Sequence, residues 1–169
     1  MPDITNLNGP ILADTVYMDG NLAARDVDVT LPGVTFMTAD FRAMGTLTLP
    51  ILGQIEAMEL AITKIGVDLG LSKATSPESK TAEIRWAQDL KGLDGSTKTV
   101  GCKAFLRVVP KGLPGIGVTP GSTSENELTY AVSRYQLFVD GKEQWLIDQL
   151  NHKLRIDGKD YYEDIESLL

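Results

Sequence analysis

Residues 128–148, with the sequence LTYAVSRYQLFVDGKEQWLID, decide the fold of this 169-residue chain. Asp140 and Gly141 stand at the centre of the stretch, between two runs rich in aromatic and aliphatic residues. Both residues tolerate the positive φ that a two-residue hairpin turn requires, so the pattern predicts a long β-hairpin. Neither face of the hairpin is cleanly polar, and we therefore expect both faces to contact protein.

A strict two-residue turn also fixes which residues of this hairpin lie opposite each other. It pairs Val139 with Lys142, and it sets Tyr135 opposite Leu146. Because side chains alternate along a strand, Tyr135 and Leu146 are then expected on one face and Trp145 on the other.

The chain contains four Asp-Gly pairs, and each lies between apolar or alternating runs. Repeated hairpin signals with few helical patterns predict a mainly β fold, an antiparallel β-barrel or sandwich with one short helix and long loops. The other three pairs are Asp19–Gly20, Asp94–Gly95 and Asp157–Gly158.

The first half of the chain is less regular. The first Asp-Gly pair predicts strands over residues 14–18 and 21–31, the second ending at Pro32 because proline cannot donate to a strand ladder. Residues 33–50 have weak periodicity, so we expect a long loop. Residues 54–65 predict a strand, although the helix formers among them also fit helical spacing. Residues 67–73 are the best candidate for a short helix.

Two alternating segments, residues 81–91 and 98–109, flank the second Asp-Gly pair. A strict two-residue turn would set Trp86 opposite Lys103, which mismatches the two apolar faces. We therefore expect a connection of odd length or a bulge, for which Gly92 is a ready site.

The remaining segments carry turn signals. Residues 111–126 are rich in glycine and proline and predict a mobile surface loop. Residues 150–169 form a C-terminal extension, in which the last Asp-Gly pair predicts a small hairpin and residues 163–169 one helical turn.

Composition excludes several classes of protein. The length fits a single domain over residues 1–169. The formal charge of −7, from 23 acidic and 16 basic residues, argues against a nucleic-acid-binding surface. A single cysteine excludes an internal disulfide. Without a visible signal peptide or a membrane helix of roughly 20 apolar residues, we expect folding in a cytoplasm and no membrane insertion.

The chain has few candidates for catalytic or metal-binding residues. His152 is the only histidine and Cys102 the only cysteine, so the usual zinc sites are excluded. We expect His152 to be structural or at an interface, and Cys102 to be a buried, inert thiol. Residues 112–121 lack the Gly-Lys-Ser/Thr ending of a phosphate loop. The acidic residues of 157–166 lack calcium-loop spacing and read as a solvated face. We expect no enzyme, no cofactor and no metal.

Four short motifs resemble one known family. YQLFVDGKEQWLID (residues 135–148), followed by LNHKLRIDGKD (residues 150–160), resembles the C-terminal part of the major tail tube protein of contractile-tail bacteriophages. Upstream, DVTLP (residues 28–32) and FRAMG (residues 41–45) are similar to the strand end and loop of that family's N-terminal segment. The match is strongest over residues 133–160 and poor over residues 66–125.

The resemblance implies a structural virion protein. Copies would form hexameric rings that stack into the hollow inner tube of a contractile tail, with sheath, baseplate or tube-initiator and tail-terminator proteins as partners. The genome would pass through the lumen without tight binding, and assembly would occur in the host bacterial cytoplasm. Alternatives are the tube of a type VI secretion or bacteriocin-like particle, a small β-barrel binding module, and an enzyme with an unrecognised site.

The apolar side chains of residues 33–50 must be buried somewhere. They either cover the chain's own core or pack on a neighbouring subunit, and the resemblance favours the second. The expected inter-subunit residues are Phe36, Phe41, Arg42, Met44, Tyr135, Phe138 and Trp145, with a hairpin turn at Asp140, Gly141, Lys142 and Glu143. Lys103 and Arg107 share a face, and if that face lines the lumen we expect acids such as Glu56 or Glu59 to balance it.

Overall fold

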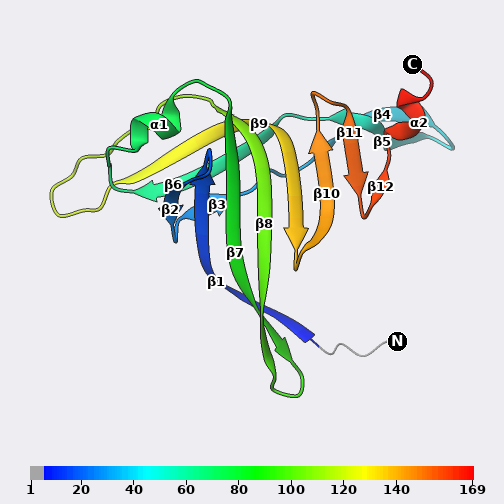
Figure 1. Ribbon diagram of the computed structural model, residues 1–169. Helices are drawn as coiled ribbons and strands as arrows, with labels where there is room; N and C mark the ends of the chain where they lie inside the picture. Colours follow the sequence, from blue (N-terminus) through cyan, green and yellow to red (C-terminus); the bar gives the residue numbers. More distant parts are fainter. Residues whose placement is uncertain (1–5) are drawn as a thin grey trace.

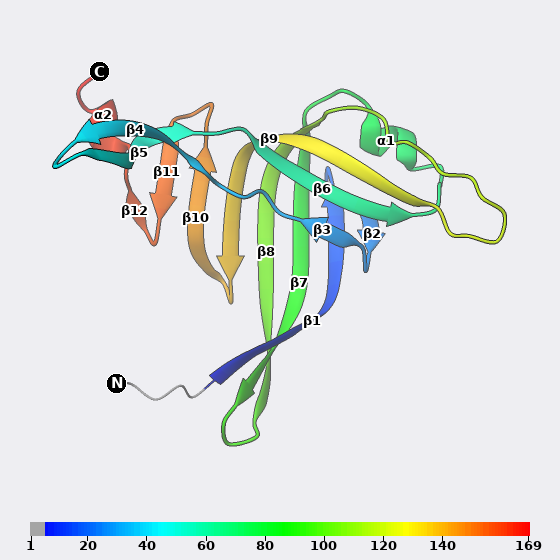
Figure 2. The ribbon, with the colours of Figure 1, turned by 180° about the vertical axis from the view of Figure 1, so that it is seen from behind.

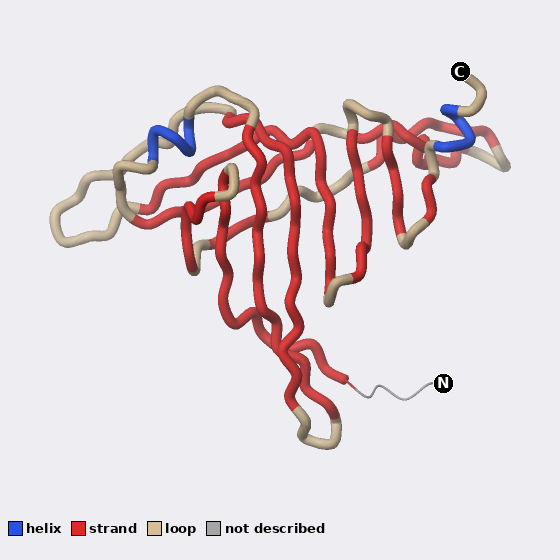
Figure 3. The backbone as a smooth tube through the Cα atoms, viewed as in Figure 1, coloured by secondary structure: helices blue, strands red, loops and turns tan. Residues whose placement is uncertain are grey.

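Antiparallel β-structure dominates the chain, as expected. The computed structural model describes residues 6–169, which form twelve strands and two short helices (Figures 1 and 3). Ten strands belong to one sheet and two form a separate hairpin. The sheet is folded into two layers that enclose the core.

Eight neighbouring strands make up the front layer. They stand side by side across the molecule in Figure 1, and each pairs antiparallel with the next. In spatial order they are β2 (Asn21–Arg25), β1 (Asn6–Met18), β7 (Lys80–Gly92), β8 (Thr97–Pro110), β9 (Glu125–Val139), β10 (Lys142–Asp148), β11 (Lys153–Ile156) and β12 (Lys159–Asp160).

Strand β9 joins the front layer to the back layer. Its first half pairs with β6 (Met58–Ile65), which in turn pairs with β3 (Asp28–Thr30), whereas its second half pairs with β10. A bulge at Ser133 separates the halves, because Arg107 faces Arg134 while Val108 faces Val132. Bulges bend a strand, and Figure 2 shows β6 and β3 crossing the strands of the front layer.

The core fills the space between the two layers. Leu60, Ile84, Leu106 and Tyr130, from β6, β7, β8 and β9, are almost completely buried. The hydroxyl of Tyr130 donates to the carbonyl of Ala74 at 3.0 Å, which ties the short helix α1 (Leu71–Thr75) to the core. Burial of the apolar faces of both layers is therefore the main stabilising contribution to this fold.

The first predicted hairpin is confirmed only over its first half. Strand β2 ends at Arg25, and Asp26 has a φ of +49° that turns the chain toward the back layer. Asp14 fixes this turn, since its carbonyl accepts from the Asp26 amide at 3.0 Å and its carboxylate from the Val27 amide at 3.0 Å. The single strand expected over residues 21–31 was wrong, because this local turn divides it into β2 and β3.

The long loop expected over residues 33–50 was also wrong. Residues 36–55 form an antiparallel hairpin of β4 (Phe36–Arg42) and β5 (Thr46–Ile55). Its turn lacks an Asp-Gly signal and places Met44 at a φ of +45°. Pro50 is tolerated because the hairpin has only two strands, so each strand keeps one free edge.

The other local predictions hold with shifted boundaries. A strand occupies residues 58–65 of the range 54–65, and α1 begins four residues later than the expected helix at residue 67. The helix starts later because the Asp68 carboxylate accepts from the Gly70 amide at 3.0 Å, which makes a turn first. The β7–β8 connection has the predicted odd length, with five residues between Lys91 and Thr97.

The segments after β8 agree with expectation. Residues 111–124 contain no strand or helix, and β9 begins at Glu125. Their mobility stays a prediction. The small C-terminal hairpin is formed by β11 and β12, and the helical turn is α2 (Glu163–Glu166).

Candidate assembly surfaces

The central hairpin β9–β10 has the predicted turn but a different register. Val139 pairs with Lys142 across the turn, where Asp140 and Gly141 have φ values of +51° and +78°. Beyond Glu143 the pairing shifts by one residue, because Gln144 forms a bulge between the Glu143–Phe138 and Trp145–Leu137 pairs. The two-residue turn at Asp140 and Gly141 is therefore present, and Lys142 and Glu143 begin β10.

The bulge decides which side chains of the hairpin are available to a neighbour. Tyr135 pairs with Ile147 rather than with Leu146, and both side chains face the core. Tyr135 is only 2% exposed, and its ring meets that of Trp145 edge-on at 5.8 Å. The expectation that Tyr135 contacts another subunit is corrected, since it fills the subunit's own core. Burial raises its pKa to about 12.

Phe138 lies on the opposite, outward face of the hairpin. Its ring packs edge-on against Phe105 of β8, with ring centres 5.7 Å apart. Phe138 therefore lies apart from Trp145, which packs against the core together with Phe36.

The β4–β5 hairpin is an amphipathic arm that extends from the main body beside α2 (Figures 1 and 2). Phe41 lies opposite Leu47, and Ala39 lies opposite Leu49, so these side chains share one apolar face. Phe41 is 51% exposed, and Leu47 and Leu49 are also exposed. Exposed apolar side chains that gather on one face commonly mark an interaction site.

The other face and the tip of the arm complete this candidate surface. The polar face carries Asp40 and Thr48, whose hydroxyl donates to the Asp40 carboxylate at 2.8 Å. Arg42 lies opposite Thr46 on that polar face, so it points away from Phe41. Met44 is fully exposed at the tip. Phe41, Arg42 and Met44 are thus gathered at one end of the arm, whereas Phe36 anchors its base.

A compact contact holds the base of the arm against the C-terminal extension. Gly53 of β5 has a φ of +80° and lies directly against the ring of Tyr162. That ring stacks on His152, with centres 5.3 Å apart and planes inclined by 21°. The side-chain amide of Gln149 donates to the Ile55 carbonyl at 3.3 Å. His152 thus lies in a structural contact.

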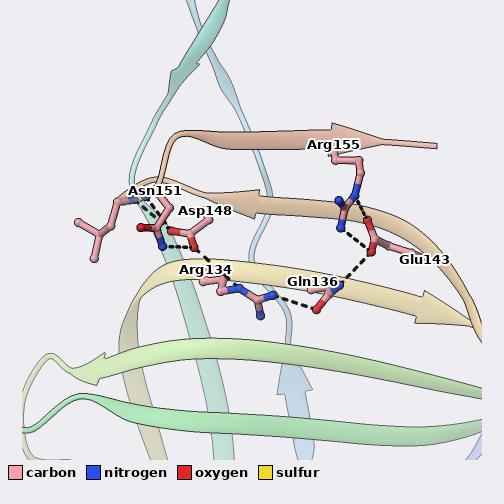
Figure 4. Close-up of polar contacts among 7 residues, drawn as sticks. Arg134, Gln136, Glu143, Asp148, Asn151 and Arg155 are labelled. Atoms are coloured by element: carbon pink, nitrogen blue, oxygen red, sulfur yellow. Dashed lines mark hydrogen bonds and ion pairs between the residues drawn. The ribbon is translucent and has the colours of Figure 1, made fainter. Parts of the chain in front are cut away.

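A chain of polar contacts crosses β9, β10 and β11 on their outward side (Figure 4). Arg155 donates to both carboxylate oxygens of Glu143, at 2.6 and 3.0 Å, and Gln136 donates to Glu143 at 2.9 Å. The hydrogen bond from Arg155 lowers the pKa of Glu143. Arg134 donates to Gln136 at 3.1 Å, and its Nε lies 3.8 Å from Asp148.

Asp148 ends this chain of contacts at the turn after β10. Its carboxylate accepts from the Asn151 side-chain amide at 2.8 Å and from the backbone amides of Leu150 and Asn151, each at 3.2 Å. Asp148 therefore fixes the turn into β11.

The strand register aligns the outward side chains of the front layer in three rows. We call this surface the basic face, because its rows hold seven basic and four acidic side chains in a chain of net charge −7. The charged members are Arg107, Arg134, Asp148 and Lys153 in the first row, Glu83, Arg155 and Asp160 in the second, and Arg25, Arg85, Lys103 and Glu143 in the third.

The outward surface of the back layer has the opposite character. We call it the acidic face, because its strands present mainly small residues and acids, with one exposed large apolar side chain, Ile65. Its other outward residues are Asp28, Thr30, Glu59, Ala61, Thr63, Glu125, Glu127, Thr129 and Ala131. Glu59 is paired with Lys111 on this side of the molecule. It therefore cannot balance Lys103 and Arg107, which lie on the basic face.

The residue types that form reactive or metal-binding sites in other proteins are scattered within residues 6–169. Cys102 is 3% exposed, and burial raises the pKa of its thiol, so the expectation of a buried thiol is confirmed. Within residues 6–169, no three His, Cys, Asp or Glu residues gather as a metal site. No helix in that range has the length and apolar character needed to cross a bilayer.

Comparison with known proteins decides among the remaining interpretations. Residues 11–169 match the family described as phage tail tube protein FII. The chain belongs to this family. The resemblance read from residues 135–160 and 28–45 is confirmed, and the chain is a structural tail tube protein of a phage or of a phage-like contractile injection system.

Solved structures with this fold agree. The chain is similar to a chain of the sheath–tube complex of an extracellular contractile injection system, PVC, in the extended state, with 15% identity, a TM-score of 0.53 and coverage of 77% of this chain and 90% of that one. It is also similar to a chain of the PVC sheath/tube terminator in the extended state, with 17% identity, a TM-score of 0.52 and coverage of 76% and 95%. No curated protein matches it.

Proposed function

We propose that this tail tube protein polymerises as stacked hexameric rings and forms the hollow inner tube of a contractile tail, the conduit through which the genome is delivered. The observation that carries the proposal is the β4–β5 arm, an amphipathic hairpin whose apolar face is exposed in a member of a tail tube family. A two-stranded hairpin is marginally stable alone, so this arm gains most from packing on another copy.

Ring formation is proposed from the sheet edges together with the resemblance. Strands β2, β3 and β12 lie at the ends of the strand order, so each has an edge without a partner strand in the described part of the chain. Open edges invite pairing with another copy, and closure into a ring removes them.

The acidic face is proposed to line the bore. Its alanine and threonine side chains are short and leave a channel open, and Asp28, Glu125 and Glu127 repel a polyanion. DNA would then pass without tight binding, because binding requires Lys and Arg that neutralise phosphates.

Stacking of rings is proposed to depend on the arm. Phe41 and Met44 would be the anchors, since binding energy concentrates in a few buried apolar side chains. Arg42 would contact the neighbour from the polar face of the arm. The PVC structures contain a sheath and a terminator, and we propose sheath, terminator and baseplate or initiator proteins as further partners, with assembly in the host bacterial cytoplasm and a final place in the virion tail.

A second candidate function is the tube of an injection device that delivers no genome. Both solved structures described above belong to an extracellular contractile injection system. Sequencing of the nucleic acid in purified particles separates the two functions, because genome-length DNA requires attached heads.

The test of assembly is sedimentation and electron microscopy of the purified protein at micromolar concentration. We expect rings or tubes from the natural sequence. The double variant Phe41→Ala, Met44→Ala should keep the circular dichroism spectrum but form rings that do not stack. The control Thr38→Ala, on the polar face toward the base of the arm, should form normal tubes. A sharp monomer boundary for the natural sequence would refute assembly and favour a binding module, and normal tubes from the Phe41, Met44 variant would refute the role of the arm.

A further inference from the structure

A groove on the basic face lies beside the chain of polar contacts and the Phe105–Phe138 ring pair. It has a volume of about 290 Å³ and lies across β7, β8 and β9. Its lining consists of two arginines, two phenylalanines, a leucine, a hydroxyl and an amide, namely Arg107, Arg134, Phe105, Phe138, Leu106, Thr81 and Gln136.

The two arginines of this groove face each other directly. Arg107 of β8 and Arg134 of β9 form a cross-strand pair, and like charges in that position destabilise a sheet. Arg134 is partly satisfied by Gln136 and, more distantly, by Asp148. Arg107 is exposed and makes no side-chain hydrogen bond or ion pair within residues 6–169. A partly satisfied guanidinium beside an exposed, unpaired one can be neutralised by an anionic group from another molecule.

We propose that this groove receives a carboxylate side chain of the sheath protein that encloses the tube. This inference rests on the proposed tube function and adds the surface by which the tube holds its sheath. Two guanidinium groups present planar forks that bind a carboxylate through paired hydrogen bonds. The edge-on phenylalanines Phe105 and Phe138 supply apolar walls for the stem of an aspartate or glutamate.

The composition of the two faces indicates that the groove contacts a protein outside the tube rather than a cargo in its bore. The acidic, small-residue face suits the bore, and it covers the opposite layer of the subunit. The basic face therefore points away from the bore. Aromatic and arginine side chains together are typical of the centre of protein interfaces.

The experiment compares variants of the full chain in co-sedimentation with the purified sheath subunit of the same particle. Arg107→Glu reverses the charge of the groove arginine that is exposed and has no side-chain partner within residues 6–169. Lys73→Glu on α1 makes the same change of charge outside the groove, and Arg107→Lys keeps the charge but removes the fork. We expect Arg107→Glu to weaken sheath retention at least tenfold, Arg107→Lys to weaken it less, and Lys73→Glu to leave it unchanged, with normal tubes from all three.

Three results would overturn the assignment. Equal sheath retention by Arg107→Glu tubes would show that the groove is not the contact. Failure of Arg107→Glu, but not of Lys73→Glu, to form tubes would assign the groove to a second copy. Retention of duplex DNA by wild-type tubes at low salt, lost in Arg107→Glu, would place the groove in the bore. Absence of tubes from the natural sequence would instead refute the proposed function, so the two failures are distinguishable.

Discussion

Replacement of Gly53 by alanine probes how the arm is held at its base. Gly53 has a φ of +80°, and a Cβ atom there would lie 2.8 Å from both Cδ2 and Cε2 of the Tyr162 ring. The ring cannot simply swing away, because its face is stacked on His152. Gly53→Ala should therefore either strain this contact or detach the arm from the C-terminal extension.

The expected loss in the free energy of unfolding of Gly53→Ala has two separable parts. An L-residue in the left-handed region costs about 1–2 kcal/mol relative to glycine, and overpacking a close contact costs about 1–3 kcal/mol. Gly53→Ala should thus destabilise by roughly 2–5 kcal/mol in total. Gly66 is a matched control, since its φ is +78° and a Cβ there would meet nothing within 4 Å. Gly66→Ala should show only the backbone part, about 1–2 kcal/mol.

The assay is urea denaturation combined with amide hydrogen exchange over residues 46–55. Both are measured in the Phe41→Ala, Met44→Ala background under conditions that keep the subunit monomeric. If the arm detaches without global unfolding, exchange over residues 46–55 accelerates while the urea midpoint stays in place. In a Tyr162→Ala background the overpacking cost of Gly53→Ala disappears, because the ring that the new Cβ would meet is gone. The double-mutant cycle should therefore give a coupling free energy of about 1–3 kcal/mol between positions 53 and 162. If Gly53→Ala matches Gly66→Ala in both measurements, the proposed contact does not hold the arm.

Three further predictions concern the central hairpin and the core. Gly141→Val places a β-branched residue at a φ of +78°, so it should cost about 1–3 kcal/mol and lower the melting temperature by several degrees; an unchanged calorimetric melting curve would contradict the strained turn. Arg155 lowers the pKa of Glu143 below its ordinary 4.5, so the stability from this pair is complete above about pH 4.5 and is lost as the pH falls through the lowered pKa. Glu143→Gln should therefore reduce the fall of the urea midpoint on acidification. An unaltered fall would rule the pair out as its cause. Cys102 is buried and its thiol pKa is raised, so a thiol reagent should label it at the rate of unfolding; rapid labelling of the native protein would show that the thiol is accessible.

Local turn chemistry made much of the fold predictable. The Asp140–Gly141 and Asp157–Gly158 turns need backbone angles that few residue pairs accept, so their positions can be read directly. Alternation across β7 and β8 was clear enough to require a connection of odd length, which the pairing of Trp86 with Cys102 confirms. The same alternation placed Cys102 in the core.

The β4–β5 arm was missed because its signal is weak. Its turn at residues 43–45 contains no Asp-Gly or Asn-Gly pair, and Pro50 suggests an interruption. The alternation of Met37, Ala39 and Phe41 with polar residues was nevertheless present. Such an exposed apolar stripe cannot be told from a core-facing strand without knowing what lies against it.

The sequence by itself determined the β class, the hairpin turns and the family, because these depend on short motifs and on turn geometry that neighbouring residues set. Only the tertiary structure decided the two bulges at Ser133 and Gln144, since a bulge is defined by the strand that pairs with it. The bulge at Ser133 lets both Val132 and Tyr135 face the core and brings Arg134 opposite Arg107, and the bulge at Gln144 sets Ile147 rather than Leu146 opposite Tyr135. Side chains alternate with a period of two, so one inserted residue reverses every assignment that follows it.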